Sequence, residues 1–296
     1  MKTLFMKLRR DYFLRFLGFL FFILMVIILV GSSTAQEPAK SLLRLESYPD
    51  SVTSISLKNQ GLKTFPKELY RFKNLQFLDL SGNDLSEIPI EIKLFTQLQF
   101  IDVSQNRIKQ LPPSFSSLVN LKSIYIGGNQ SLDIDQAIDV MPAKNIETLD
   151  LQFDNISTLP INIGKFKNLK KLILTGNPIQ KLPTTFSQLT NLQILFINKD
   201  PYFDIDQNIE TLNKINALQE LHLEEDNLSY IPEKLLKLQS LEYLYLSKNN
   251  IEKFPSVSSE LRSLKYLDIS DNALPKLEIE GLENRLAPTL KINFGN

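Results

Sequence analysis

One pattern of 23 residues recurs along most of the chain. The stretch from Leu75 to Gln97, LQFLDLSGNDLSEIPIEIKLFTQ, shows it most completely. Successive copies start 23 residues apart, except after Leu121 and Leu192, where the steps are 25 and 26 residues. Ten copies in register indicate a repeat protein, in which each coil buries its apolar face only against its neighbours. The units start at Val52, Leu75, Leu98, Leu121, Ile146, Leu169, Leu192, Leu218, Leu241 and Leu264.

Each unit reads L-x-x-L-x-L-x-x-N-x-L-x-x-L-P, and its L-x-L core alternates as a short strand with one buried face does. Asparagine follows the strand, where the chain turns inward. Its side chain can both donate and accept, so stacked coils are expected to form a ladder of buried asparagines. Asp154, Asp200 and Asp226 replace asparagine in three units and Gln60 in a fourth; because carboxylates cannot donate, weaker bonding is expected near the aspartates. The predicted ladder consists of Asn83, Asn106, Asn129, Asn177, Asn249 and Asn272.

Prolines also keep the register, fourteen residues after the unit start, and they favour a turn on the outer side of each coil. The units that lack this proline begin at Leu121, Leu192 and Leu264, which is every third one. Two of them carry the tetrapeptide DIDQ, at 133–136 and 204–207, followed by insertions of helical character. A triplet of 71 or 72 residues is therefore the larger period, and its insertions are expected on one stripe of the convex side.

The chain resembles the leucine-rich repeat family, of the L-P-x-x-[IF]-x-x-L-x-N-L kind, most clearly over residues 182–192. The resemblance covers about 245 residues, from Val52 onward. It implies an α/β repeat solenoid: a curved horseshoe of about ten repeats, with a concave parallel sheet, short convex helical, 3-10 and turn segments, and partner binding on the concave side. We expect the solenoid over residues 52–288, an N-terminal cap over 36–51 and a C-terminal cap strand over 289–296.

Residues 1–35 read as a leader. A basic segment precedes an uncharged apolar run from Phe16 to Val30, and small residues follow at the spacing of a cleavage site. This pattern predicts a secretory signal peptide. The alternative is an uncleaved membrane anchor over residues 14–30, which reaches the lower limit for spanning a bilayer. Either way the repeats are expected outside the cytoplasmic membrane, as a secreted, periplasmic or surface protein.

The cysteine content and the charge balance of the chain limit the classes of protein to which it can belong. The chain has no cysteine, which excludes a lipid-anchored lipoprotein and fits a bacterial envelope protein better than an animal secreted one. The whole chain has 33 basic and 33 acidic side chains. Without the leader, which holds five basic residues and one acidic residue, 28 and 32 remain, a net charge of −4. Nucleic-acid binding needs a clustered basic surface, so we expect no nucleic-acid partner.

The solvent-facing strand positions carry more apolar and aromatic residues than an ordinary exposed sheet. Rings on a preformed concave surface bury much area at low entropic cost, so these positions predict a binding face for another protein. Two alternatives remain open: β-propensity alone favours such residues, or packing between strands absorbs them. The stacked aspartates Asp79, Asp102, Asp150 and Asp268 are interpreted as a common feature of the repeat strand rather than as a binding site. The candidate partner-binding residues are Phe77, Phe100, Tyr125, Ile173, Ile194, Phe196, His222, Tyr243, Tyr245 and Tyr266.

His222 is the only histidine, with Glu220 and Glu224 on its face of the strand. One imidazole with acidic neighbours is a weak metal signal, so a polar contact role is preferred and no metal is predicted. The sequence has no nucleophile motif, phosphate-binding glycine loop or second histidine, which predicts a non-enzymatic protein without a cofactor. The alternative function is carbohydrate or ligand binding at a surface, with rings stacked on sugars beside Asp150 or Asp268. Membrane contact is expected only through the N-terminal segment.

Overall fold

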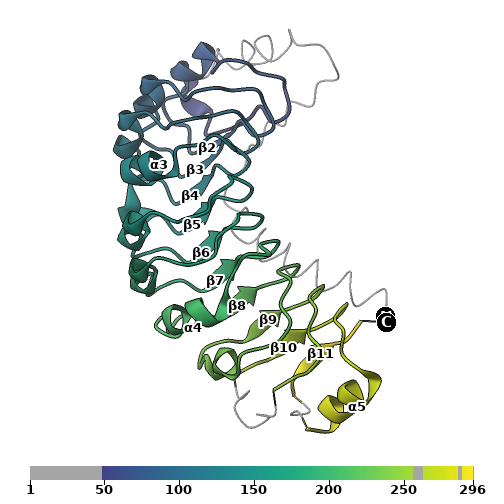
Figure 1. The fold of residues 1–296 in the computed structure, drawn as a ribbon. Coiled ribbons are helices and arrows are strands. Elements are labelled where there is room, and N and C mark those ends of the chain that lie inside the picture. The colour runs from purple at the N-terminus through teal and green to yellow at the C-terminus, as the bar shows by residue number, and fades with distance from the viewer. Residues whose placement is uncertain (1–48, 256–262, 286–288, 296) are drawn as a thin grey trace.

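The computed structural model describes residues 49–255, 263–285 and 289–295. In these ranges eleven strands form one sheet, and each pairs in parallel with the next in sequence order. The coils stack into a curved solenoid with the strands on the inner side (Figure 1). The predicted α/β solenoid is confirmed. The strands are β1 Ser54–Ser56, β2 Phe77–Asp79, β3 Phe100–Asp102, β4 Ser123–Tyr125, β5 Thr148–Asp150, β6 Lys171–Ile173, β7 Ile194–Phe196, β8 Glu220–His222, β9 Tyr243–Tyr245, β10 Tyr266–Asp268 and β11 Lys291–Asn293.

Short 3-10 helices cover the outer side of the coils. Six of them begin directly after the in-register proline, which is the N-cap residue in an extended or near-extended conformation. Proline fixes φ and needs no hydrogen-bond acceptor for a backbone N–H, so it suits this entry turn. The helices are η1 Pro49–Ser51, η2 Lys67–Arg71, η3 Ile90–Leu94, η4 Pro113–Ser117, η5 Ala143–Asn145, η6 Ile161–Lys165, η7 Thr184–Gln188 and η8 Glu233–Lys237.

Every third coil carries an α-helix instead: α3 Ile134–Val140, α4 Ile205–Leu212 and α5 Lys276–Arg285. The first aspartate of each DIDQ motif caps its helix, because the Asp133 side chain accepts from the Gln136 backbone N–H and Asp204 from that of Gln207. The helices α3 and α4 project from the outer side of the solenoid (Figure 1). The tetrapeptides that mark the triplet therefore start helices.

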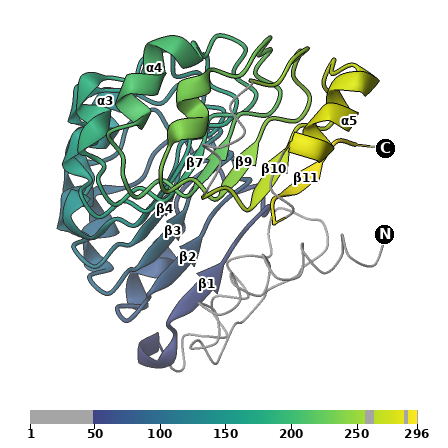
Figure 2. The same ribbon diagram turned by 90° about the horizontal axis from the view of Figure 1, so that it is seen from below.

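The core lies between the sheet and the outer helices. The central residue of each strand from β1 to β10 is an almost fully buried leucine or isoleucine. A second layer of phenylalanines, among them Phe72, Phe95 and Phe166, closes the coils near the 3-10 helices. This core continues from coil to coil and fixes the curvature of the sheet (Figure 2). The side chains on the concave face of the sheet therefore keep fixed spacings.

The asparagines of the repeat connect neighbouring coils. Asn106 shows the pattern: its Nδ2 donates to the carbonyls of Leu80 and Val103, both at 3.0 Å, and its Oδ1 accepts from the Leu85 N–H at 2.9 Å. A residue in the left-handed region precedes each of these positions, as Gln105 does with φ of 54°. This backbone conformation directs each asparagine side chain towards the preceding coil.

Asp154 and Asp226, which replace asparagine, are less completely bonded. One oxygen of each accepts from the preceding coil, whereas the Oδ2 atoms have no hydrogen-bond partner within the described residues. Burial, partly offset by these hydrogen bonds and reinforced by neighbouring carboxylates, raises the pKa of each to about 8. Asp200 differs, because both of its oxygens accept backbone N–H groups, from Ile179 and Tyr202.

Two predicted segments fall mainly outside the described ranges. The leader, residues 1–35, and residues 36–48 of the predicted N-terminal cap are not described. Across the parts of the chain that are described, we find no helix with the length and apolar character needed to cross a bilayer. Strand β11 lies within the segment predicted as a C-terminal cap strand.

Candidate functional site

The strand register aligns two columns of side chains on the concave face. One column runs through the first residue of each strand, from Ser54 to Lys291, and the other runs through the third, from Ser56 to Asn293. The candidate partner-binding residues all lie in these columns. Parallel neighbours are about 4.8 Å apart, which is close enough for planar rings on consecutive strands to stack.

Three rings form an N-terminal ring stack of Phe77, Phe100 and Tyr125. The Phe77 and Phe100 rings are nearly parallel, with centroids 4.3 Å apart, and Tyr125 tilts against Phe100 at 5.2 Å. Burial and the nearby carboxylates of Asp150 and Asp102 raise the pKa of Tyr125 to about 12. Its hydroxyl therefore stays protonated and available as a donor at neutral pH.

Four rings form a C-terminal ring stack of Phe196, His222, Tyr245 and Tyr266. The His222 ring lies between two others, with its centroid 3.8 Å from that of Phe196 and 4.2 Å from that of Tyr245, at interplanar angles of 13° and 5°. Tyr266 continues the series at 5.4 Å and 48°. The amino group of Lys171 lies 4.9 Å from the centroid of the Phe196 ring. Ile173, Ile194 and Tyr243 border this stack and are half-buried.

Stacking changes the exposure that the sequence suggested. The concave rings were expected to face solvent, but they are half-buried and His222 is only 8% exposed, because each ring covers its neighbour. His222 therefore offers little contact area of its own. The large apolar side chains that are exposed lie elsewhere, including Ile90 on η3 and Ile161 on η6, and the sequence analysis did not single them out. The concave rings are thus partly covered by one another.

Two glutamates bind the edges of the His222 ring. Its Nε2 lies 2.8 Å from Glu220 Oε1, and its Nδ1 lies 3.1 Å from Glu224 Oε1. Burial by itself lowers the pKa of His222, but the hydrogen bonds and charges of the two glutamates outweigh it, so the pKa lies above the usual value. Glu220 shares the concave column with Lys171 and is 7% exposed. The sequence placed these side chains on one face but did not indicate that both ring nitrogens would be bound.

The concave aspartates help to end the strands. Asp79, Asp102 and Asp268 each accept from both the backbone N–H and the hydroxyl of the serine two residues later. Asp150 accepts instead from the backbone and side chain of Gln152. Contrary to the expected exposure of this column, Asp150 is 2% exposed, and burial, partly offset by these hydrogen bonds, raises its pKa to about 6.

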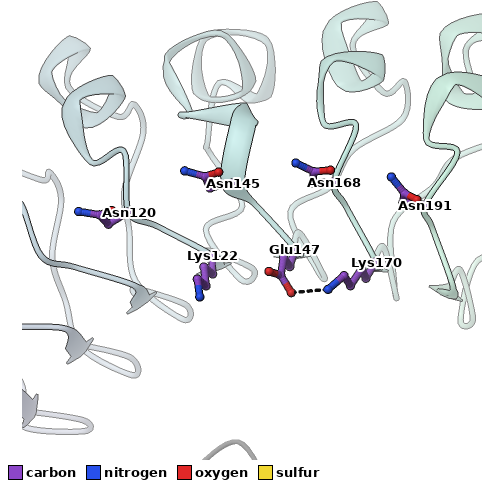
Figure 3. A pocket seen from close by; sticks show the side chains of 7 residues that line it. All are labelled: Asn120, Lys122, Asn145, Glu147, Asn168, Lys170 and Asn191. Carbon is purple, nitrogen blue, oxygen red and sulfur yellow. Dashed lines mark hydrogen bonds and ion pairs between the residues drawn. The ribbon is translucent and has the colours of Figure 1, made fainter.

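A second column of asparagines, which the sequence analysis missed, immediately precedes the unit starts. Asn145 Nδ2, for example, donates to the Val119 carbonyl at 2.7 Å, and Asn168 Nδ2 to that of Lys144 at 2.8 Å. Four of these amides and a row of charged side chains line an open groove of about 450 Å³ (Figure 3). Its lining residues are Asn120, Lys122, Asn145, Glu147, Asn168, Lys170 and Asn191, and Glu147 pairs with Lys170 at 2.8 Å.

Potential metal ligands are not clustered into a metal site among the described residues. Over the described ranges, no group of three or more histidine, cysteine or acidic side chains is arranged to hold a metal ion. The carboxylates nearest His222 are instead directed to its ring nitrogens. The groups on the concave face are suited to packing and hydrogen bonding.

Sequence models of the leucine-rich repeat match four separate segments, all within the stacked coils. "Leucine rich repeat" matches residues 216–274, "Leucine Rich repeats (2 copies)" matches 96–139, and "Leucine Rich Repeat" matches 74–94 and 168–189. The chain is a leucine-rich repeat protein. Among curated protein sequences, none matches this leucine-rich repeat chain.

A comparison with solved structures shows a similar fold. A crystal structure of an internalin (inlF) from Listeria monocytogenes is similar with a TM-score of 0.56 at 16% identity, over 86% of this chain and 84% of that one. An internalin C2 (inlC2) structure from the same species has a TM-score of 0.48 at 21% identity, over 75% of this chain and 82% of that one. The likeness to the inlF structure concerns the fold.

Proposed function

We propose that this leucine-rich repeat protein acts by binding another protein on its concave face. The stacking of the rings of Phe196, His222 and Tyr245 carries the proposal, with contributions from Ile173, Ile194, Tyr243 and the N-terminal ring stack. Rings that are already packed lose little conformational entropy when a partner arrives. A rigid solenoid can thus present them as a preformed surface, which favours association.

The direction of the rings favours a protein partner over a carbohydrate. Sugars bind aromatic side chains by lying on a ring face, but Phe77, Phe100, Phe196 and Tyr245 each have one face stacked on a neighbouring ring. The ring edges carry partial positive charge and suit carbonyl oxygens and aliphatic groups of a protein. Tyrosine hydroxyls add directional hydrogen bonds, as at many protein interfaces.

The proposed site of action is outside the cytoplasmic membrane. The basic segment, apolar run and small residues of 1–35 support export, either with cleavage of the leader or with retention of residues 14–30 as an anchor. A secreted, periplasmic or surface-exposed solenoid would meet its partner there. We propose that the partner is bound without chemical change, since the concave face gathers packing and hydrogen-bonding groups.

Site-specific crosslinking tests the proposal. A photoreactive phenylalanine analogue at Tyr243, beside the C-terminal ring stack, is expected to give a discrete protein adduct in cells of the source organism. The same analogue at Ile161, which is 63% exposed on the outer side, is the matched control and is expected to give none. Equal labelling from both positions, or adducts from Ile161 alone, would contradict concave binding. A glycan adduct at Tyr243 would support the carbohydrate alternative.

A further inference from the structure

His222 is held on both faces and on both edges. Phe196 and Tyr245 cover its two faces, while Glu220 and Glu224 lie at hydrogen-bonding distance from its two nitrogens. We propose that His222 is the positioning residue of the C-terminal ring stack and that it works as an imidazolium ion clamped between the two glutamates. The stack would then be ordered by a buried charge as well as by apolar packing.

With both glutamates ionised, only the charged form of His222 satisfies both hydrogen bonds. A neutral imidazole has one N–H and one lone pair, so it can donate to one carboxylate only and must oppose its lone pair to the other. The protonated ring donates at both nitrogens, which satisfies the 2.8 Å contact to Glu220 and the 3.1 Å contact to Glu224 together. The carboxylates of Glu220 and Glu224 are poorly exposed and lie close together at the end of β8. Buried negative charges are costly without a positive charge nearby, which the protonated His222 supplies.

The oxygen of Glu224 that does not contact the ring strengthens this requirement. Glu224 Oε2 is buried, and no hydrogen-bond partner for it exists among the described residues. A carboxylate in this position is costly unless a positive charge lies close by. Loss of the proton from His222 would leave the carboxylates of Glu220 and Glu224 beside a ring that can donate to only one of them.

The surrounding groups leave the two glutamates as the main charges that act on His222. From β6, Lys171 reaches the other side of Phe196 and interacts chiefly with Glu220 and Asp150. From β9, Tyr245 is part of the stack and Tyr243 borders it. Asp226, two residues beyond Glu224, is a further acidic group close to Glu224, and its Oδ1 accepts from the backbone of the preceding coil.

The sign of the pH dependence follows from the raised pKa. His222 binds a proton more tightly in the folded protein than in the unfolded chain, whose histidine titrates at about pH 6.5. The stabilisation is therefore fully present below that pH and is lost as the pH rises through the folded-state pKa. The ring stack should loosen over this interval. The affinity for the protein partner should fall over the same interval, an expectation that rests on the function proposed above.

The test follows the rings directly by NMR on the full chain labelled at histidine, phenylalanine and tyrosine. Because His222 is the only histidine, its titration is unambiguous. We expect its pKa above that of free histidine, and Phe196 and Tyr245 ring signals that change with the same midpoint. Glu224→Gln should shift the His222 midpoint to lower pH. The matched control is Glu225→Gln, whose side chain pairs with Lys248 at 3.1 Å and should leave the midpoint unchanged.

A second variant separates charge from packing. His222→Phe keeps a planar ring in the stack but cannot bind the glutamates, so its neighbours' signals should become independent of pH over this interval. The proposal is overturned if His222 titrates at or below the free value, if Glu224→Gln and Glu225→Gln behave alike, or if the rings still titrate in His222→Phe. No partner is present in these measurements, so their outcome is independent of whether the proposed protein binding is correct.

Discussion

Asn177 and Asp226 occupy the same turn in different coils and have side chains of nearly the same shape. Asn177 accepts two backbone N–H groups through Oδ1, and its Nδ2 donates to the carbonyls of Leu151 and Leu174 at 2.8 and 2.7 Å. Asp226 accepts through Oδ1, but its buried Oδ2 bonds to no described group. The turn geometry therefore survives the loss of a donor, and the loss appears as an unpaired oxygen.

The coil that follows an aspartate coil takes over part of the bonding. Asn177 accepts from the N–H groups of both Asp154 and Ile156, and Asn249 does so from Asp226 and Leu228. In the coils of Asp154 and Asp226 a second left-handed residue, Asn155 or Asn227, comes directly after the aspartate. Asn106, which follows another asparagine coil, accepts only from Leu85 among its described contacts. The ladder positions are thus unequal in what they support.

The largest expected effect comes from removing an asparagine that follows an aspartate coil. Asn177→Ala removes the acceptor of two buried N–H groups and the donor to two carbonyls, and we expect it to lower the free energy of unfolding by roughly 3–5 kcal/mol. Asn106→Ala should cost roughly 2–3 kcal/mol. Urea denaturation followed by circular dichroism measures both. Equal losses would show that the additional N–H bond at Asn177 contributes nothing to stability.

A smaller effect of opposite sign is expected from Asp226→Asn. An amide donates at every pH, whereas the Asp226 carboxyl group loses its proton above its pKa of about 8, so the variant should be about 1–2 kcal/mol more stable at about pH 9. Asp200→Asn is the matched comparison. Both oxygens of Asp200 already accept N–H groups, so an amide would oppose one of these donors and should not stabilise the protein. Calorimetric unfolding of the two variants decides whether the unpaired oxygen is the cause.

A dependence of stability on pH is also expected. Asp154 and Asp226 hold their protons up to about pH 8 in the folded chain, whereas unfolded aspartates lose them near pH 4. The folded state binds more protons between these values, so stability should fall as the pH rises from about 4 to about 8. Unfolding midpoints of the parent and of Asp154→Asn/Asp226→Asn should diverge over this interval. Parallel curves would contradict protonated aspartates in the ladder.

The sequence predicts the strands well because a fixed period defines which residues face the core. Each of the first ten strands begins two residues after a unit start, such as β2 at Phe77 after Leu75. The repeat also contained the overlooked asparagine column, since Asn74, Asn120, Asn145, Asn168 and Asn191 each directly precede a unit start. That signal could have been found by reading the remaining columns in the same way.

The surface properties of the rings could not be predicted in this way. Whether Phe196 exposes its face or packs against His222 depends on the spacing between coils and on rotamers, which a one-dimensional pattern does not contain. The same holds for the exposure of Asp150, which depends on the packing of its neighbours. Periodicity determines which face a side chain occupies, and packing between coils determines what it presents there.

The helices α3 and α4 start in coils whose unit starts, Leu121 and Leu192, are 71 residues apart. Each helix begins at the same offset within its coil, and each is followed by coils of the 23-residue kind. A genetic duplication or loss of one such block would therefore join coil edges of matching shape, without exposing a core. Three coils together, rather than one, form the natural step by which a solenoid of this kind can be lengthened or shortened.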